Sequence, residues 1–371
     1  LIMVNINNFK DRYLPPDKLN SFLWSLKKLG NLTVLGYSER KRPIYGYKIG
    51  KGSLKVLIWS QMHGNESTTT KSLIDLLNLF ESGDYSYLLK KLKLILIPQL
   101  NPDGAALYTR HNSNSVDLNR DFVNLTQSES KTLMKVFNKI KPDFCFNLHG
   151  QRTHYSAGKM GLPSTLSFLA PASDNKGTIS KSREDSMKLI ASINNHMQNY
   201  IPNQIARFDD SFNINCVGDK FSSLGVSTIL FEAGHYQDDY NRNITRKHML
   251  NTLIHVLKSI IQNNHKAYSV NDYLSIPENN MDYCDLLIKG VDINDNQSTY
   301  INQDLVINYK EILKNSNIDF VPKFIGYSDS YVGLAHKTVE FKNLEISGPI
   351  KFKLNYLSTK MKHITDKLLN M

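Results

Sequence analysis

The stretch LKVLIWSQMHGNESTTTKSLIDLLNLFES, residues 54–82, decides the fold. An apolar run typical of a buried strand leads through the short polar segment MHGNE into a helix that Ser and Thr residues open. Further along the chain, apolar runs continue to alternate with amphipathic segments. Strands that alternate with helices in this way predict an open α/β sheet, parallel or mixed, with helices covering both of its faces.

The apolar periodicity on either side of this stretch sets the other expected elements. The expected strands cover 32–37, 43–50, 54–61, 92–100, 143–150 and 226–234. The expected helices cover 16–29, 67–82, 128–140, 182–200 and 246–261. Between the strand 92–100 and the helix 128–140, we expect a long polar loop that reaches about Asn124.

The length of 371 residues is more than one average domain needs. After about Tyr268 the pattern changes to short alternating apolar runs broken by Asn, Asp and Gly, which indicates β-strands. We therefore expect two domains: a catalytic α/β domain over 1–267 and a small accessory β-rich domain over 268–371. In the second, His336 and Glu340 lie close in sequence but lack a third partner, so we interpret them as a solvated pair.

Composition excludes several classes of protein. The formal net charge is +11, but Lys and Arg are spread along the chain and no nucleic-acid reader motif is present, so no nucleic-acid partner is expected. The three cysteines, Cys145, Cys216 and Cys284, are too far apart for a disulfide framework or a CxxC metal site. No run reaches the roughly 18 apolar residues of a membrane span. We expect a cytoplasmic protein without a membrane partner, although a chain that begins with Leu leaves a removed leader open.

Polar residues stand at the ends of four predicted strands. His63 follows the first, Asn101 and Asp103 follow the second, His149 ends the third, and Glu232 ends the fourth. A single histidine at a strand end is usually an ordinary loop residue. In open α/β sheets, however, chemistry gathers at the carboxyl ends of the strands, so four such ends predict one site.

The residue types indicate a catalytic metal. A catalytic zinc takes three protein ligands and keeps one position open, and two histidines with one glutamate form such a set. His63 and Glu66, three residues apart at the entry to a helix, can aim at one point, and His149 supplies the third ligand. We expect one Zn²⁺ per chain, with Glu232 as the general base that takes a proton from water and passes it to the leaving amine.

The segment NPDGAALYTRHNSNSVDLNRDF, residues 101–122, adds the cations that a hydrolase of this kind needs. Arg110 is the candidate for stabilising negative charge on the attacked carbonyl oxygen. Arg120, with Asn119, can bind a substrate carboxylate through the forked guanidinium. We interpret Asp117 as a structural residue that stiffens the loop.

These motifs, in the order HGNE, NPDG, TRHNSNSVDLNR, NLH and FE, resemble the M14 family of zinc carboxypeptidases over roughly residues 30–262. The resemblance implies a carboxypeptidase-like fold, in which a mixed, twisted, eight-stranded sheet lies between helices. It also implies that His63, Glu66 and His149 bind zinc, that Arg110 polarises the carbonyl, that Asn119 and Arg120 bind the terminal carboxylate, and that Glu232 is the general base. The implied activity is removal of C-terminal residues from peptides that end in a free carboxylate.

Two departures from the family pattern limit what the resemblance implies. Many members carry a tyrosine about twenty residues before the catalytic glutamate, but residues 205–225 contain none. Phe208 or Phe212 can cover the pocket there without donating a hydrogen bond. By position, the pocket floor should lie at 216–219, which offers neither the single acid expected for basic side chains nor a clear apolar floor. The preferred C-terminal side chain is therefore not predicted, and neither is the oligomeric state.

Several neighbouring residues keep two interpretations. Arg152 and His154 either border the pocket and favour an acidic substrate or are solvated loop residues. His235 and Tyr236 either orient Glu232 or pack in the interior.

Two other functions remain open. The motifs are also similar to the succinylglutamate desuccinylase and aspartoacylase group, which would make the chain a zinc-dependent deacylase of N-acyl amino acids. A binding module that has lost catalysis would require replacement of a zinc ligand or of the base, and no such replacement is present.

Overall fold

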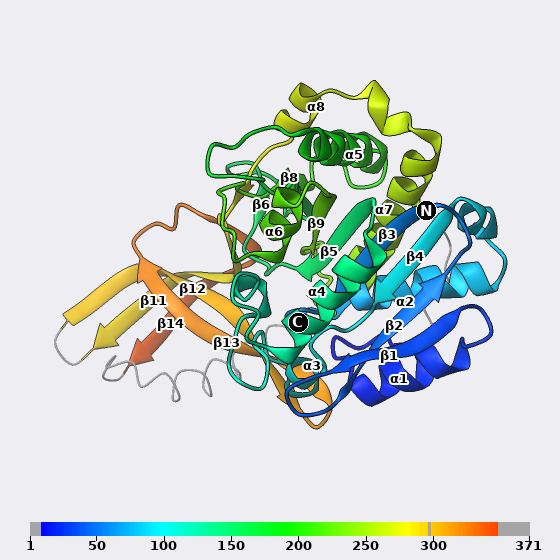
Figure 1. The fold of residues 1–371 in the computed structure, drawn as a ribbon. Coiled ribbons are helices and arrows are strands. Elements are labelled where there is room, and N and C mark those ends of the chain that lie inside the picture. The colour runs from blue at the N-terminus through cyan, green and yellow to red at the C-terminus, as the bar shows by residue number, and fades with distance from the viewer. Residues whose placement is uncertain (1–8, 296–297, 348–371) are drawn as a thin grey trace.

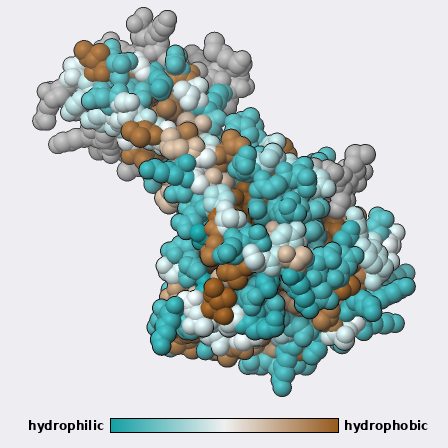
Figure 2. Space-filling view, turned by 90° about the horizontal axis from the view of Figure 1, so that it is seen from above, coloured by the Kyte–Doolittle hydropathy of each residue, from teal (hydrophilic) through white to brown (hydrophobic). Residues whose placement is uncertain are grey.

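The computed structural model describes residues 9–295 and 298–347 and divides into a large α/β body and a smaller four-stranded sheet beside it (Figure 1). In the space-filling view the smaller sheet forms a lobe of its own (Figure 2). The expected fold class is confirmed: an eight-stranded mixed sheet with helices, plus a β-rich C-terminal sheet. The boundary between residues 267 and 268 stays a prediction.

The eight-stranded sheet has the strand order β1-β2-β4-β3-β5-β9-β7-β8. Its centre is parallel, because β4, β3, β5 and β9 pair in parallel, whereas β1 with β2, β2 with β4 and β7 with β9 pair antiparallel. The strands are β1 (Asn31–Tyr37), β2 (Pro43–Ile49), β3 (Leu54–Ser60), β4 (Leu92–Ile97), β5 (Phe144–Gly150), β7 (Leu166–Leu169), β8 (Ile205–Arg207) and β9 (Ser227–Ala233).

Helices cover both faces of this sheet because successive strand side chains point to opposite sides. In β3, Val56 and Ile58 join one apolar cluster, which α1 (Pro16–Ser25), α2 (Thr68–Glu81), α5 (Lys181–Met197) and α7 (Asn243–Gln262) complete. Leu57 and Trp59 join a second cluster, which α4 (Ser128–Ile140) and α6 (Val217–Ser223) complete. The central strands are therefore buried on both faces, which makes their ends rigid supports.

The polar segment after β4 contains two short helical pieces where we expected a continuous loop. Asn101 caps α3 (Pro102–Leu107) by accepting a hydrogen bond from the backbone of Gly104, and Pro102 occupies its first position. A 3₁₀ turn, η2, covers Leu118–Arg120. The strands β7 and β8 and the helix α6 were missed, since elements of three to seven residues show too little periodicity.

The C-terminal sheet has the order β13-β12-β11-β14. Its strands are β11 (Tyr283–Asp295), β12 (Ser298–Lys314), β13 (Asn317–Ser328) and β14 (Leu334–Ser347). Residues before it remain attached to the body: Tyr273 of α8 (Val270–Leu274) lies in the main core, and β10 (Asn279–Asn280) pairs with β6 (Ser156–Ala157). The remaining turns are η1 (Ser86–Lys90) and η3 (Asn264–Ala267).

The C-terminal sheet docks on the body through its long strands. The guanidinium of Arg12 contacts Glu311 of β12 at 3.1 Å, and the hydroxyl of Tyr108 donates to the same carboxylate. His336 of β14 was expected to be solvated, but it is buried, and its Nε2 lies 2.8 Å from the carbonyl oxygen of Thr153. Across the described ranges, no helix is long and apolar enough to cross a membrane.

Candidate active site

The predicted site residues meet at the carboxyl ends of three adjacent strands, β3, β5 and β9. His63 follows β3, while His149 and Glu232 stand directly opposite each other in the register of β5 and β9. Glu66 reaches the same place from the turn that enters α2. The fold thus places two histidines and two glutamates from three segments together, whereas Asn101 and Asp103, at the remaining strand end, do not join them.

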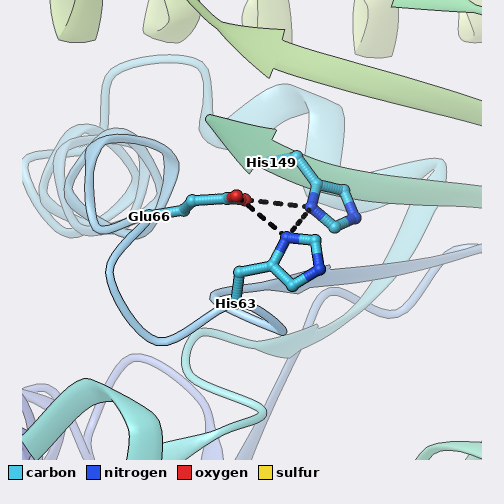
Figure 3. A group of neighbouring side chains, drawn as sticks. All are labelled: His63, Glu66 and His149. Atoms are coloured by element: carbon cyan, nitrogen blue, oxygen red, sulfur yellow. Dashed lines mark hydrogen bonds and ion pairs between the residues drawn. The ribbon is translucent and has the colours of Figure 1, made fainter. Parts of the chain in front are cut away.

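Three of these side chains converge on one point (Figure 3). Nδ1 of His63 lies 2.8 Å from Oε1 of Glu66, and Nδ1 of His149 lies 3.0 Å from Oε2 of Glu66. The two Nδ1 atoms are 3.1 Å apart. The three residues are at most 8% exposed. Here the two Nδ1 atoms face each other and each lies beside an oxygen of Glu66. The lone pairs of such atoms repel one another unless a cation lies between them, so the arrangement favours cation binding.

Asp117 fixes the orientation of His63. Nε2 of His63 lies 3.0 Å from Oδ1 of Asp117, and because a carboxylate only accepts, Nε2 carries the proton. Nδ1 faces the carboxylate of Glu66 at 2.8 Å, so a metal ion bound there would take the place of a proton on Nδ1 and use its lone pair. Asp117 was expected only to stiffen its loop, so this contact with His63 was missed. The donor set therefore fits a zinc ion.

The charges in this cluster influence one another strongly. Burial raises the pKa of Glu66, but His63 and His149 outweigh it and hold the carboxyl well below its usual range. For His63, burial lowers the pKa, yet Glu66 and Asp117 reverse the sign and raise it. Burial keeps the pKa of His149 low. Glu66 is thus ionised and His149 is held neutral, which are the protonation states that metal ligation requires.

Glu232 differs from Glu66 in its surroundings. Its Oε2 is buried and has no hydrogen-bond partner among the described residues. Burial, followed by repulsion from Glu66, raises its pKa well above the usual value. A carboxyl that is unpaired, shielded and close to a metal-ligand cluster has the properties of a group that exchanges protons with bound molecules.

The arginines occupy the same cavity as the cluster. Arg110 donates from Nε and Nη2 to Oδ2 of Asp117, and its Nη1 lies 3.7 Å from Glu66. Arg120 is exposed, and its Nη1 contacts Sγ of Cys216 at 3.1 Å. The side chain of Asn119 accepts a hydrogen bond from the backbone of Val217, so it ties this loop to the start of α6.

The residues expected at the pocket floor form the first turn of α6. Asp219 is 6% exposed, lines the cavity and accepts a hydrogen bond from the backbone of Asn213. Burial raises the pKa of Asp219 to about 6. The segment 216–219 therefore presents one buried acid, whose pKa lies above its usual value.

Asn101 and Asp103 have structural roles. Nδ2 of Asn101 donates to the carbonyl oxygen of Met62, and Asp103 accepts from Arg42 and from the backbone of Arg40. Between these motifs, Gly64 lies so close to α3 that an added Cβ would be 2.0 Å from the carbonyl carbon of Gly104. The HGNE turn is therefore packed directly against the NPDG turn.

The cavity has a volume of about 1600 Å³ and is lined by further residues beside the predicted site. Tyr155 lines it, with its ring 5.5 Å from the ring of Phe208. Arg152 and His154 also line it, so they border the pocket, whereas a preference for acidic substrates stays a prediction. His235 is buried against His336 with ring centroids 4.3 Å apart, which favours packing.

A protein-family model described as zinc carboxypeptidase, Peptidase_M14, matches residues 25–140. Carboxypeptidase 2 of Trichophyton rubrum is 28% identical over 111 residues, which is 29% of this chain and 20% of that protein. Carboxypeptidase SOL1 of Arabidopsis thaliana is 32% identical over 105 residues, which is 24% of this chain and 21% of that protein. The matches thus span about a fifth of these relatives' length.

Solved structures extend the likeness to most of the fold. Bovine thrombin-activatable fibrinolysis inhibitor, solved in complex with tick carboxypeptidase inhibitor, matches with a TM-score of 0.57 and 15% identity over 69% of this chain and 99% of that chain. A metallo-carboxypeptidase from Pseudomonas aeruginosa, in complex with (2-guanidinoethylmercapto)succinic acid, matches with a TM-score of 0.52 and 16% identity over 68% and 71% of the two chains. At these identities the likeness concerns the fold. The family-model match and the curated relatives thus show that a part of the chain is similar to zinc carboxypeptidases of the M14 family, and the solved structures extend the similarity of fold to about two thirds of the chain.

Proposed function

We propose that this protein is a zinc-dependent hydrolase that removes C-terminal amino acids from peptides. The observation that carries the proposal is the register of β5 and β9, which sets Glu232 beside His149 and hence beside the cluster of His63 and Glu66. Metal-assisted hydrolysis requires a general base without another hydrogen-bond partner, placed next to three residues that can bind the metal. His63, Glu66 and His149 would hold one zinc ion.

Zinc bound there would polarise the scissile carbonyl and make a water molecule easier to deprotonate. Glu232 takes the proton from the attacking water at its unpaired oxygen and returns it to the nitrogen of the leaving amino acid. A cation near Glu66 opposes the repulsion that raises the pKa of Glu232, so it also favours the ionised base. Arg110, held by Asp117, faces the negative charge that develops on the carbonyl oxygen.

Arg120 and Asn119 bind the C-terminal carboxylate of the peptide in this proposal. Arg120 is exposed in the cavity and has no carboxylate partner among the described side chains, so its guanidinium is available to a ligand. Its contact with Cys216 orients the fork toward α6, where Asp219 and the expected floor of the pocket lie. The proposed catalytic unit is residues 1–267, and residues 268–371 form the accessory domain. Cytoplasmic location stays a prediction.

The size of the cavity favours peptides over N-acyl amino acids as substrates. Small-molecule sites measure about 300–1,000 Å³, whereas this cavity measures about 1600 Å³ and includes strands of the C-terminal sheet. A small acyl amino acid would fill only part of it.

A substrate library tests the proposal. The zinc-loaded protein is incubated with defined peptides and N-acyl amino acids, with and without a chelator, and the products are read by mass spectrometry. Release of single C-terminal residues that the chelator abolishes and added zinc restores is the expected result. Loss of acyl groups alone would assign the chain to the deacylases, and silence of the zinc-loaded protein toward all substrates would contradict hydrolysis.

A further inference from the structure

One wall of the cavity belongs to the C-terminal sheet. The zinc-ligand cluster and Glu232 line one side, and two stretches of the β12–β13 hairpin, residues 308–312 and 320–327, line the other. Figure 1 shows this hairpin reaching from its own sheet to the body near α3. A peptide whose last residue lies at this cluster has room to extend along the hairpin.

Side-chain contacts hold this wall in place. Glu311 binds Arg12 and Tyr108 of the body, and the rings of Tyr309 and Phe320 each pack against the ring of Tyr240 at 5.4 Å. The hydroxyl of Tyr240 also donates to Asp285 of β11 at 3.1 Å. A surface fixed by several partly buried contacts can select ligands, because it does not need to be ordered on binding.

The charges on this wall are not balanced. Its carboxylates are already occupied, Glu311 by Arg12 and Tyr108, and Asp285 by Tyr240 and the backbone of Tyr309. The cations are different: Lys310, Lys323 and Arg152 line the cavity, are exposed, and have no carboxylate within 4.0 Å among the described side chains. Of the other acids of the cavity, Glu66 and Glu232 lie on the opposite side, Asp219 lies in α6, and Asp209 lies in the segment before it.

We propose that the β12–β13 hairpin, together with Arg152, binds the part of the peptide upstream of the cleaved bond and selects chains that carry Asp or Glu there. This inference rests on the proposed carboxypeptidase activity and adds the substrate class. The walls of a cleft concentrate the field of like charges, so three unpaired cations attract carboxylates more strongly together than on an open surface. The attraction involves exposed groups and therefore weakens as salt rises.

The test compares two hexapeptides with the same C-terminal residue, one with four Glu upstream and one with four Gln, which have nearly the same shape. We expect wild-type kcat/KM at low salt to favour the Glu peptide by about tenfold, since each exposed ion pair contributes only a few-fold. In the double variant Lys310→Gln/Lys323→Gln this preference should fall to about twofold or less, as Arg152 alone remains. Lys314→Gln is the matched control, because Lys314 is exposed on the same hairpin but outside the cavity.

A short N-blocked dipeptide separates failure of this inference from failure of the proposed function, because it does not reach the hairpin. If wild type and double variant cleave the dipeptide equally but wild type cleaves both hexapeptides at the same rate, the hairpin does not select acidic chains. Retention of the Glu preference in the double variant would overturn the inference too. If the zinc-loaded wild type cleaves neither the dipeptide nor any hexapeptide, the proposed hydrolysis itself is wrong.

Discussion

The two walls of the cavity are built in different ways. The wall with His63, His149 and Glu232 consists of the ends of central strands buried on both faces, so the sheet register itself sets the distances between these groups. The hairpin wall comes from a separate sheet and is held by a few side chains, chiefly Arg12, Glu311 and Tyr240. Groups that handle protons need fixed geometry, whereas a surface that selects substrates can vary without altering the chemistry.

The strongest way to break this comparison is Glu232→Gln on the first wall. The amide cannot accept the proton, so kcat should fall about 1,000-fold or more while zinc content stays near one per chain. Stopped assays with a hexapeptide and metal analysis of the same preparation measure the two quantities. Glu81→Gln, at the exposed end of α2, is the control. Full turnover by Glu232→Gln would remove this residue from the mechanism.

Asp117→Asn tests whether the residue that orients His63 contributes to the affinity for zinc. Loss of the contact with His63 Nε2 should weaken zinc binding by about 10- to 100-fold. Competition with a fluorescent zinc chelator gives the affinity, with Asp84→Asn on the exposed turn after α2 as control. Unchanged zinc affinity would return Asp117 to the purely structural role first expected for it.

Arg120→Ala tests, on the catalytic side of the cavity, whether binding of the substrate carboxylate can be separated from the chemical step. KM for peptides with a free C-terminus should rise roughly tenfold, because a charged hydrogen bond is lost, whereas slow cleavage of C-terminally amidated peptides should not change. Arg120→Lys keeps the charge without the fork and should fall between the two. An equal loss with free and amidated peptides would show that Arg120 does not read the carboxylate.

Glu311→Gln breaks the second wall and should have the smallest effect on the chemistry. The substitution leaves Arg12 without its anion, so the free energy of unfolding should fall by roughly 1–3 kcal/mol. This loss is smaller than for a fully buried ion pair, because 26% of the Glu311 side chain is exposed. Turnover of a blocked dipeptide should change less than about twofold. Urea unfolding measures the first quantity, with Glu340→Gln, exposed on β14, as control.

The same pair predicts a pH dependence of docking. Burial raises the pKa of Glu311, but Arg12 outweighs it, so the pKa lies below the usual 4.5. Its stabilising contribution is therefore complete above pH 4.5 and is lost as the pH falls through the lowered pKa. Unfolding curves of wild type and Glu311→Gln should differ at pH 7 and converge in acid. A constant difference down to pH 3 would contradict this account.

The sequence predicted the first wall far better than the second. Strand-end residues such as His149 and Glu232 could be found because parallel strands bring their carboxyl ends together whatever the details of packing. The contribution of Lys310 or Lys323 to the cavity depends on how one sheet docks on another, and no local pattern records that. The role of Asp117 was missed for a related reason, since a carboxylate next to an arginine looks structural until its second oxygen is seen to reach His63.

The close approach of Gly64 to Gly104 has a consequence for anyone who wishes to move this site into another scaffold. Because the backbones of the HGNE and NPDG turns touch and Asn101 holds Met62, the two turns behave as one transplantable part. A graft that copied His63, Glu66 and His149 onto a new sheet but left out NPDG would present the right ligands on a turn free to drift. The smallest portable unit is therefore a pair of loops, and screening in such a project should vary them jointly.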